Sequence, residues 1–153
     1  MEGRDQDTGH DGAAKAAPNP GDARRVSVRL RPTSTAAERA RRALQRLALP
    51  TPLADEAELL VSEVVTNSIR HAGLGPDDLI HVTADWTGTR LRVHVRDRGH
   101  IAHPAVVSGS IRPAPGAESG WGLYLVDRLA SRWGTDTDGY WFELHPGPRR
   151  SGA

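Results

Sequence analysis

The chain of 153 residues contains no cysteine, and Lys15 is its only lysine. Without cysteine it can form no disulfide, no thiol nucleophile and no thiolate metal site. The single lysine lies in a segment without apolar periodicity, and no Gly-x4-Gly-Lys-Ser/Thr loop occurs, so this type of nucleotide site is excluded. Any phosphate site must therefore use backbone amides, a helix N-terminus, arginine or a metal ion.

A strong charge imbalance and long apolar runs are also missing. The 20 basic and 19 acidic residues give a formal net charge of +1, which supplies no electrostatic case for direct nucleic-acid binding. No run approaches the length of a membrane span, and the N-terminus lacks the apolar core of a signal peptide. We therefore expect a soluble, cytoplasmic protein that binds no membrane.

The apolar patterns predict one domain between two tails. Residues 1–24 are rich in Gly, Asp, Ala and Pro and are predicted to be disordered, 25–145 form the domain, and 146–153 form a flexible tail. Alternating segments predict strands near 26–30, 79–86, 90–97, 132–136 and 140–144. Longer apolar periods predict helices near 33–49, 53–72 and 120–130.

The helix at 53–72 carries a polar stripe formed by Glu63, Asn67 and His71. These residues are four apart, so they follow one side of a helix. The stripe borders the apolar face instead of lying opposite to it, where a solvated face would lie. We therefore expect the stripe to face a cleft between this helix and the sheet.

Asp97 ends a strand on the same side as Val93 and Val95, which predicts an inward position. A buried carboxylate needs a partner, because its desolvation is costly. Gly99, two residues later, would permit the close approach of a ligand or an unusual backbone angle. The alternative is an ordinary polar strand end that turns into a loop.

Residues 98–119 show no clear periodicity and are predicted to form a long loop, which in a compact domain is usually functional or disordered. The loop ends at Gly120 and Gly122, which open the next helix and are followed by Leu123. A helix N-terminus flanked by glycines suits an anion, because its free N–H groups and the helix dipole point the same way. Close packing of the helix on the sheet would explain the glycines equally well.

The predicted first helix has a run of arginines at Arg39, Arg42 and Arg46, away from its apolar side. A solvated helix face is the simpler interpretation. A surface for an acidic partner is the alternative.

Together these motifs resemble those of the GHKL ATP-binding fold. The order is Glu-x3-Asn-x3-His on a helix, Asp-x-Gly after a strand, then a long loop that ends in Gly-x-Gly-Leu. The segment Glu63-Val-Val-Thr-Asn67-Ser-Ile-Arg-His71 is similar to the N-box of the anti-sigma-factor serine kinases. The resemblance covers about residues 26–144 and implies an α+β two-layer sandwich, with a mixed, mostly antiparallel sheet covered by helices on one face.

The resemblance also implies a role for each of these residues. Asn67 would bind Mg²⁺ beside the ATP phosphates, Glu63 would be the general base, and Asp97 would accept the exocyclic amine of adenine. The remaining nucleotide-binding positions implied are Gly99, Gly120, Gly122 and Leu123. The loop 98–119 would be the ATP lid, and His71 would have a supporting role.

Two positions depart from the family pattern. The second box often reads Asp-x-Gly-x-Gly, whereas this chain has Ile101 in place of the second glycine. This change predicts a stiffer start to the lid. The threonine often found just before the last strand is Gly139 here, which predicts one contact fewer near the adenine.

The implied function is that of a Mg²⁺-ATP-dependent serine/threonine kinase acting as a bacterial anti-sigma factor. Such a protein binds a sigma factor and phosphorylates an anti-anti-sigma antagonist on serine. An ATP-binding sequestering module with little or no phosphotransfer is the main alternative. The ATP domain of a two-component histidine kinase fits less well, because no phospho-accepting dimerisation helices precede the predicted domain. Members of the family commonly form dimers, so the resemblance also suggests a homodimer.

Overall fold

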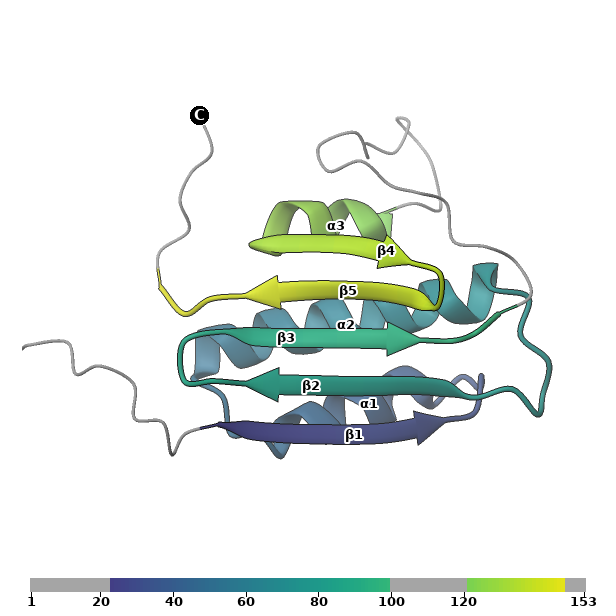
Figure 1. Ribbon diagram of the computed structural model, residues 1–153, viewed down its shortest axis with the longest axis horizontal. Helices are drawn as coiled ribbons and strands as arrows, with labels where there is room; N and C mark the ends of the chain where they lie inside the picture. The colour runs from purple at the N-terminus through teal and green to yellow at the C-terminus, as the bar shows by residue number, and fades with distance from the viewer. Residues whose placement is uncertain (1–22, 100–120, 148–153) are drawn as a thin grey trace, which may run out of the picture.

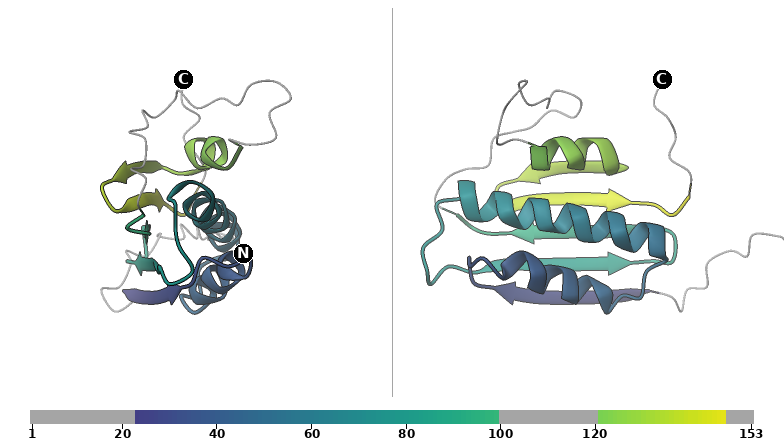
Figure 2. Two further views of the ribbon diagram at one scale, coloured as in Figure 1. Left: turned by 90° about the vertical axis from the view of Figure 1, so that its right-hand side faces the viewer. Right: turned by 180° about the vertical axis from the view of Figure 1, so that it is seen from behind.

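The computed structural model describes residues 23–99 and 121–147, which form a sheet with helices on one face (Figures 1 and 2). The elements are β1 (Arg24–Leu30), α1 (Ala36–Gln45), α2 (Thr51–His71), β2 (Ile80–Trp86), β3 (Leu91–Arg96), α3 (Trp121–Leu129), β4 (Arg132–Asp136) and β5 (Gly139–Leu144). The strand order is β1-β2-β3-β5-β4. The predicted α+β layers are thus confirmed.

Every strand pair among the described residues is antiparallel, which agrees with the expected mostly antiparallel sheet but not with its mixed character. The difference comes from the connection after β3. The chain passes through α3 to the outer strand β4, and β5 then returns between β4 and β3. Because β5 runs opposite to both neighbours, no parallel pair arises here.

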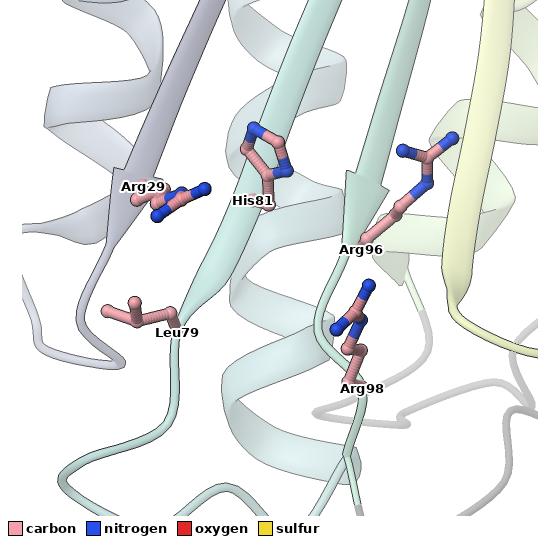
Figure 3. Close-up of a pocket in the computed structure, with 5 residues that line it drawn as sticks. All are labelled: Arg29, Leu79, His81, Arg96 and Arg98. Carbon is pink, nitrogen blue, oxygen red and sulfur yellow. The ribbon is translucent and has the colours of Figure 1, made fainter.

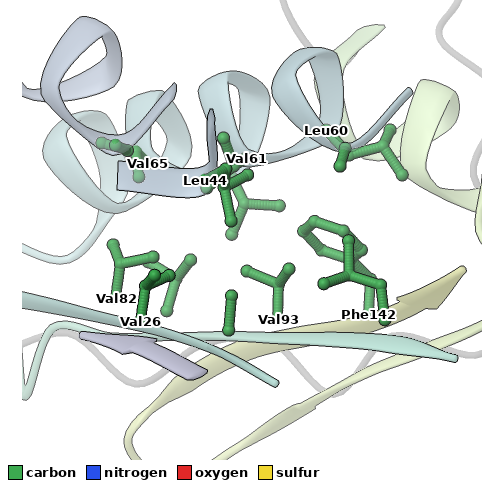
Figure 4. Packing of buried hydrophobic residues seen from close by; sticks show 14 of the residues in the cluster. Val26, Leu44, Leu60, Val61, Val65, Val82, Val93 and Phe142 are labelled. Atoms are coloured by element: carbon green, nitrogen blue, oxygen red, sulfur yellow. The ribbon is translucent and has the colours of Figure 1, made fainter. Parts of the chain in front are cut away.

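The core fills the space between the sheet and the helices (Figure 4). Strand residues such as Val82, Val93 and Phe142 point towards α2, whose Leu60 and Val61 are fully buried. Burying each of these side chains stabilises the fold by about 1.5–3 kcal/mol. The alternating apolar residues of the strands and the apolar face of α2 thus meet in one core, as their sequence patterns predicted.

The first helix is shorter than the sequence predicted. It ends at Gln45 and not near Leu49, and the chain then tightens through a hydrogen bond from the Ala48 amide to the Gln45 carbonyl. Ala48 has a left-handed backbone, with φ of 47°, which directs the chain away from the helix axis. The helix begins at Ala36, after Thr35, and not near residue 33; the Thr35 side chain makes no capping hydrogen bond.

This arrangement gives α2 a central position. Its side chains contact α1, α3, β3 and β5, and α3 lies beside it (Figure 2). Among the described helices, none has the length and apolar character of a membrane span.

Candidate functional site

Glu63 and Asn67 lie under the first turn of α3. A Cβ atom placed on Gly122 would come within 2.6 Å of the Glu63 Oε2 atom and 3.5 Å of the Asn67 Nδ2 atom. Glu63 and Asn67 therefore face α3, whereas we expected the stripe to face a cleft between helix and sheet. The pattern of α2 alone does not show which later element covers its polar side.

The Asn67 side chain lies at this contact with its Nδ2 atom unpaired. Its Nδ2 atom is buried and has no hydrogen bond within the described residues. A buried, unpaired amide carries a cost of about 1–3 kcal/mol, so such a group is expected to bind something in the working protein. Because the amide N and O atoms can be exchanged by a flip, the same side chain can present an oxygen to a cation.

Ser68, the next residue on α2, was missed by the sequence reading. It is fully buried, and its Oγ atom has no hydrogen-bond partner among the described residues. Its position beside Asn67 in the sequence could have been noticed, because serine is a rare choice on the buried side of a helix.

Asp97 is buried at the end of β3, as its strand parity predicted, with 2% of its surface exposed. Its Oδ1 atom accepts a hydrogen bond of 3.0 Å from the Gly99 amide, and its own amide donates to the Asp138 carbonyl at 2.9 Å. These bonds fix the carboxylate at the point where β3 ends, so it is not a free strand end turning into solvent.

The turn after Asp97 contacts the C-terminal end of α2. A Cβ atom on Gly99 would lie 2.2 Å from the Ala72 carbonyl oxygen, so only glycine fits there. In this structure Gly99 thus permits the close approach of the α2 backbone, whereas we expected it to permit the approach of a ligand or an unusual backbone angle. The unusual backbone angle belongs to its neighbour Arg98, with φ of 46°, a conformation that costs a non-glycine residue about 1–2 kcal/mol.

Tyr140 was also missed by the sequence reading. It is 2% exposed, it lies on β5 opposite Val95, and it is close enough to the Asp97 carboxylate for that charge to act on it. Burial, and secondarily the Asp97 charge, raises the pKa of Tyr140 above its usual value. The phenol is therefore neutral at physiological pH and can serve as a donor beside Asp97.

Other predicted site residues divide into three groups. His71 is exposed at the last residue of α2, and we find no hydrogen bond for it within 23–99 and 121–147. Leu123 is half-buried and packs against the core. Gly120 and most of the lid 98–119 lie outside the described residues, as do the two predicted tails apart from their innermost residues.

The site residues follow one another along α2. Glu63 and Asn67 lie at Gly122, and Ala72 lies at Gly99. At 1.5 Å per residue, the distance along the helix axis from Asn67 to Ala72 is about 7.5 Å, and from Glu63 to Ala72 about 14 Å. These lengths suit an extended ligand with a base at the Asp97 end and a charged group at Asn67.

The polar side chains of this site fit a Mg²⁺ ion that is coordinated mainly by a bound phosphate ligand and water. They do not fit a metal site formed by protein side chains alone. Among the described residues, no group of three or more His, Cys, Asp or Glu side chains could hold a metal ion. Mg²⁺ at phosphate sites commonly takes one or two protein ligands together with waters and phosphate oxygens. The unpaired amide of Asn67 meets that requirement.

Residues 26–140 match the model of the protein family described as histidine kinase-like ATPase domain. The matched range includes Glu63, Asn67, Asp97 and Gly122. A search of curated proteins found no match.

Proposed function

The chain belongs to the histidine kinase-like ATPase domain family, a family of ATP-binding modules, and from this we propose that it is a serine/threonine kinase. In this proposal it uses Mg²⁺-ATP and acts as a bacterial anti-sigma factor. It binds a sigma factor and phosphorylates a serine of an anti-anti-sigma antagonist. The fold and family support ATP binding; the N-box sequence supports the narrower function.

The observation that carries the proposal is the position of Glu63 next to Asn67 under Gly122. Binding of Mg²⁺-ATP uses the asparagine, and the carboxylate one helical turn away adds a group that can accept a proton. A kinase needs a group that accepts the proton of the attacking hydroxyl, and a carboxylate within reach of the phosphate site can do this. The pair thus suits phosphotransfer.

Each remaining residue has a binding role in this proposal. Asn67 holds Mg²⁺, which neutralises phosphate charge when it is bound. Asp97 accepts a hydrogen bond from the adenine amine, and Tyr140 lies beside its carboxylate. The absence of a side chain at Gly122 lets the first turn of α3 pack closely on Glu63 and Asn67, which brings the N-terminal amides of this helix near the proposed phosphate end.

A sequestering module remains the second candidate. It has one specific support, the groove of about 250 Å³ that Arg39, Arg42 and Arg46 line together with Val28 and Ala43. An acidic partner segment could bind this groove whether or not phosphate is transferred.

Incubation with labelled ATP and a serine-bearing antagonist protein separates the two candidates. The kinase proposal predicts label on the antagonist, dependent on Mg²⁺ and lost when its serine is replaced by alanine. Nucleotide binding measured in parallel, without any transfer to several antagonists, would leave only the sequestering role.

Asp97→Ala is expected to weaken ATP binding by about 10- to 150-fold, because a charge-assisted hydrogen bond contributes about 1.5–3 kcal/mol. The variant should also lose its preference for ATP over GTP. Calorimetric titration with both nucleotides measures each effect. Asp85→Ala is a suitable control, because Asp85 lies on the opposite face of the sheet and pairs with Arg25. Unchanged ATP affinity in Asp97→Ala would contradict the assignment.

Reversal of charge at Arg39 and Arg46 tests the partner surface. Both side chains are exposed, and neither makes an ion pair within the described part of the chain, whereas Arg42 pairs with Glu38. We expect Arg39→Glu with Arg46→Glu to weaken sigma-factor binding at least about tenfold, as like charges replace attractive ones, and to leave ATP affinity unchanged. Arg70→Glu, exposed on α2, is the matched control. Equal partner affinity in both variants would assign the arginines to a solvated face.

A further inference from the structure

A basic pocket lies on the face of the sheet that carries no helix (Figure 3). It has a volume of about 310 Å³ and is lined by Arg29, Leu79, His81, Arg96 and Arg98. The side chains come from β1, β2 and the end of β3, which are adjacent in the sheet. The volume is at the lower end of the range for small-molecule sites, about 300–1,000 Å³.

Strand register explains why the basic side chains meet. Arg29 pairs with His81, which in turn pairs with Arg96, so the three lie in one row across the sheet. The next position in the row is Gly139 of β5, which has no side chain. Arg98 extends the group beyond the end of β3.

A second row on the same face has the opposite character. It runs through Arg25, Asp85, Arg92, Glu143 and Arg132, so that the signs of charge alternate across five strands. Arg25 pairs with Asp85 at 3.4 Å and Arg92 with Glu143 at 2.7 Å. Alternation of this kind neutralises a sheet face without any ligand.

Within the described strands, the one acid of the pocket row is Asp136 of β4, which pairs with Gly139 at the far end of the row, so β1, β2 and β3 contribute no acid to it. Arg29, Arg96 and Arg98 make no ion pair within 23–99 and 121–147, and no carboxylate of these described residues lines the pocket. The nearby acid Asp136 contacts His94 at 2.8 Å and accepts a hydrogen bond from the Asp138 amide. Three guanidinium groups brought together without an acid repel one another, although Arg29 and Arg98 are exposed to water, and a bound anion would relieve this repulsion.

We propose that this pocket binds a small phosphate-type oxyanion, such as a free diphosphate or the phosphoryl group of a small metabolite. Guanidinium groups from three positions can donate to separate oxygens of such an anion, and the ring of His81 offers a further contact. Leu79, 44% exposed, supplies an apolar wall for the organic part of a phosphorylated ligand.

The pocket is separate from the nucleotide site. Arg96 and Arg98 have the strand parity opposite to that of Asp97, so the pocket and the adenine-binding carboxylate lie on opposite faces of the sheet. Anion binding in the basic pocket is therefore independent of the proposed kinase activity, and the outcome of one test does not decide the other.

His81 reports on occupancy. Its Nε2 atom lies 2.7 Å from the Ser27 hydroxyl. Burial, and then the charges of Arg29, Arg96, Arg25 and Arg98, lowers the pKa of His81 below its usual value. Asp85, the nearest acid on the same strand and face, is paired with Arg25. A bound anion stabilises the imidazolium form, so it must raise the pKa of His81.

The experiment titrates the full chain with sodium pyrophosphate at constant ionic strength while the ring signals of His81 are followed by NMR. We expect saturable binding, a rise in the pKa of His81, and at least about a tenfold loss of affinity in Arg96→Gln. Glucose 6-phosphate in a second arm distinguishes a phosphorylated metabolite from free diphosphate, according to which binds more tightly.

Two controls define the site. Arg132→Gln removes an arginine from the alternating row on the same face and should leave pyrophosphate affinity unchanged. Asn67→Ala should leave it unchanged too, which separates this pocket from the phosphate end of the nucleotide site. The proposal is overturned by the absence of saturation up to about 10 mM pyrophosphate, or by equal affinity in Arg96→Gln. Tighter binding of a polyglutamate peptide than of pyrophosphate would likewise overturn it, in favour of an acidic protein partner.

Discussion

Glu63→Gln is expected to lower phosphotransfer by about 10²–10⁴-fold, the usual contribution of a general base, while ATP affinity stays within about twofold. Glutamine has the shape of glutamate but cannot accept the proton of the attacking serine at neutral pH. It preserves the contact with Gly122, where the Glu63 Oε2 atom comes within 2.6 Å of the position of a Cβ. The geometry of α3 is therefore retained and the change isolates the chemistry.

Single-turnover transfer of labelled phosphate to the antagonist measures the rate, and titration with a non-hydrolysable ATP analogue measures binding. Glu58→Gln is the matched control, since Glu58 lies on the same helix but accepts a hydrogen bond from Gln45 of α1 at 3.2 Å. A transfer rate in Glu63→Gln equal to that of the control would remove Glu63 from the chemistry. Transfer absent in the unaltered protein would instead favour sequestration.

Much of this site could be predicted from the sequence because local periodicity determines it. The four-residue spacing of Glu63 and Asn67 placed them on one side of α2, and strand parity placed Asp97 inward, where the structure has it. The match to the ATPase family confirms the fold that these motifs suggested. The roles of the individual residues stay predictions.

The remaining features depend on contacts between distant segments, which periodicity cannot show. The contact of Gly122 with Glu63 depends on how α3 packs against α2, and the contact of Gly99 with Ala72 on where β3 ends relative to α2. The basic pocket arises from register, because Arg29, His81 and Arg96 become neighbours only when three strands pair. Their sequence positions give no such signal.

Gly139 shows how such a contact alters the meaning of a sequence difference. We treated it as a lost threonine and expected one contact fewer near the adenine. In the structure it begins β5 opposite Arg96, and a Cβ there would lie 1.9 Å from the Val95 carbonyl oxygen. With this backbone no side chain fits, so glycine is required by the close approach of β3 and β5.

Gly139→Ala is accordingly expected to reduce the free energy of unfolding by about 2–4 kcal/mol, because the clash is with backbone and cannot be relieved by a rotamer change. That is a large part of the roughly 5–15 kcal/mol typical of a domain. A displacement of β5 should also weaken ATP binding, because both neighbours of Gly139 interact with Asp97. The Asp138 carbonyl accepts a hydrogen bond from the Asp97 amide, and the Asp97 charge acts on Tyr140.

Urea denaturation followed by tryptophan fluorescence measures the free energy of unfolding. ATP titration at low temperature, where the variant stays folded, measures the change in ATP affinity. Gly75→Ala is the control, because its Cβ would make only an ordinary contact of 3.5 Å with the Asp78 Oδ2 atom. Equal stability of the two variants would show that β5 can move away from β3 at little cost. In that case the position of Tyr140 beside Asp97 would be adjustable, and the adenine end of the site would not depend on this strand pair.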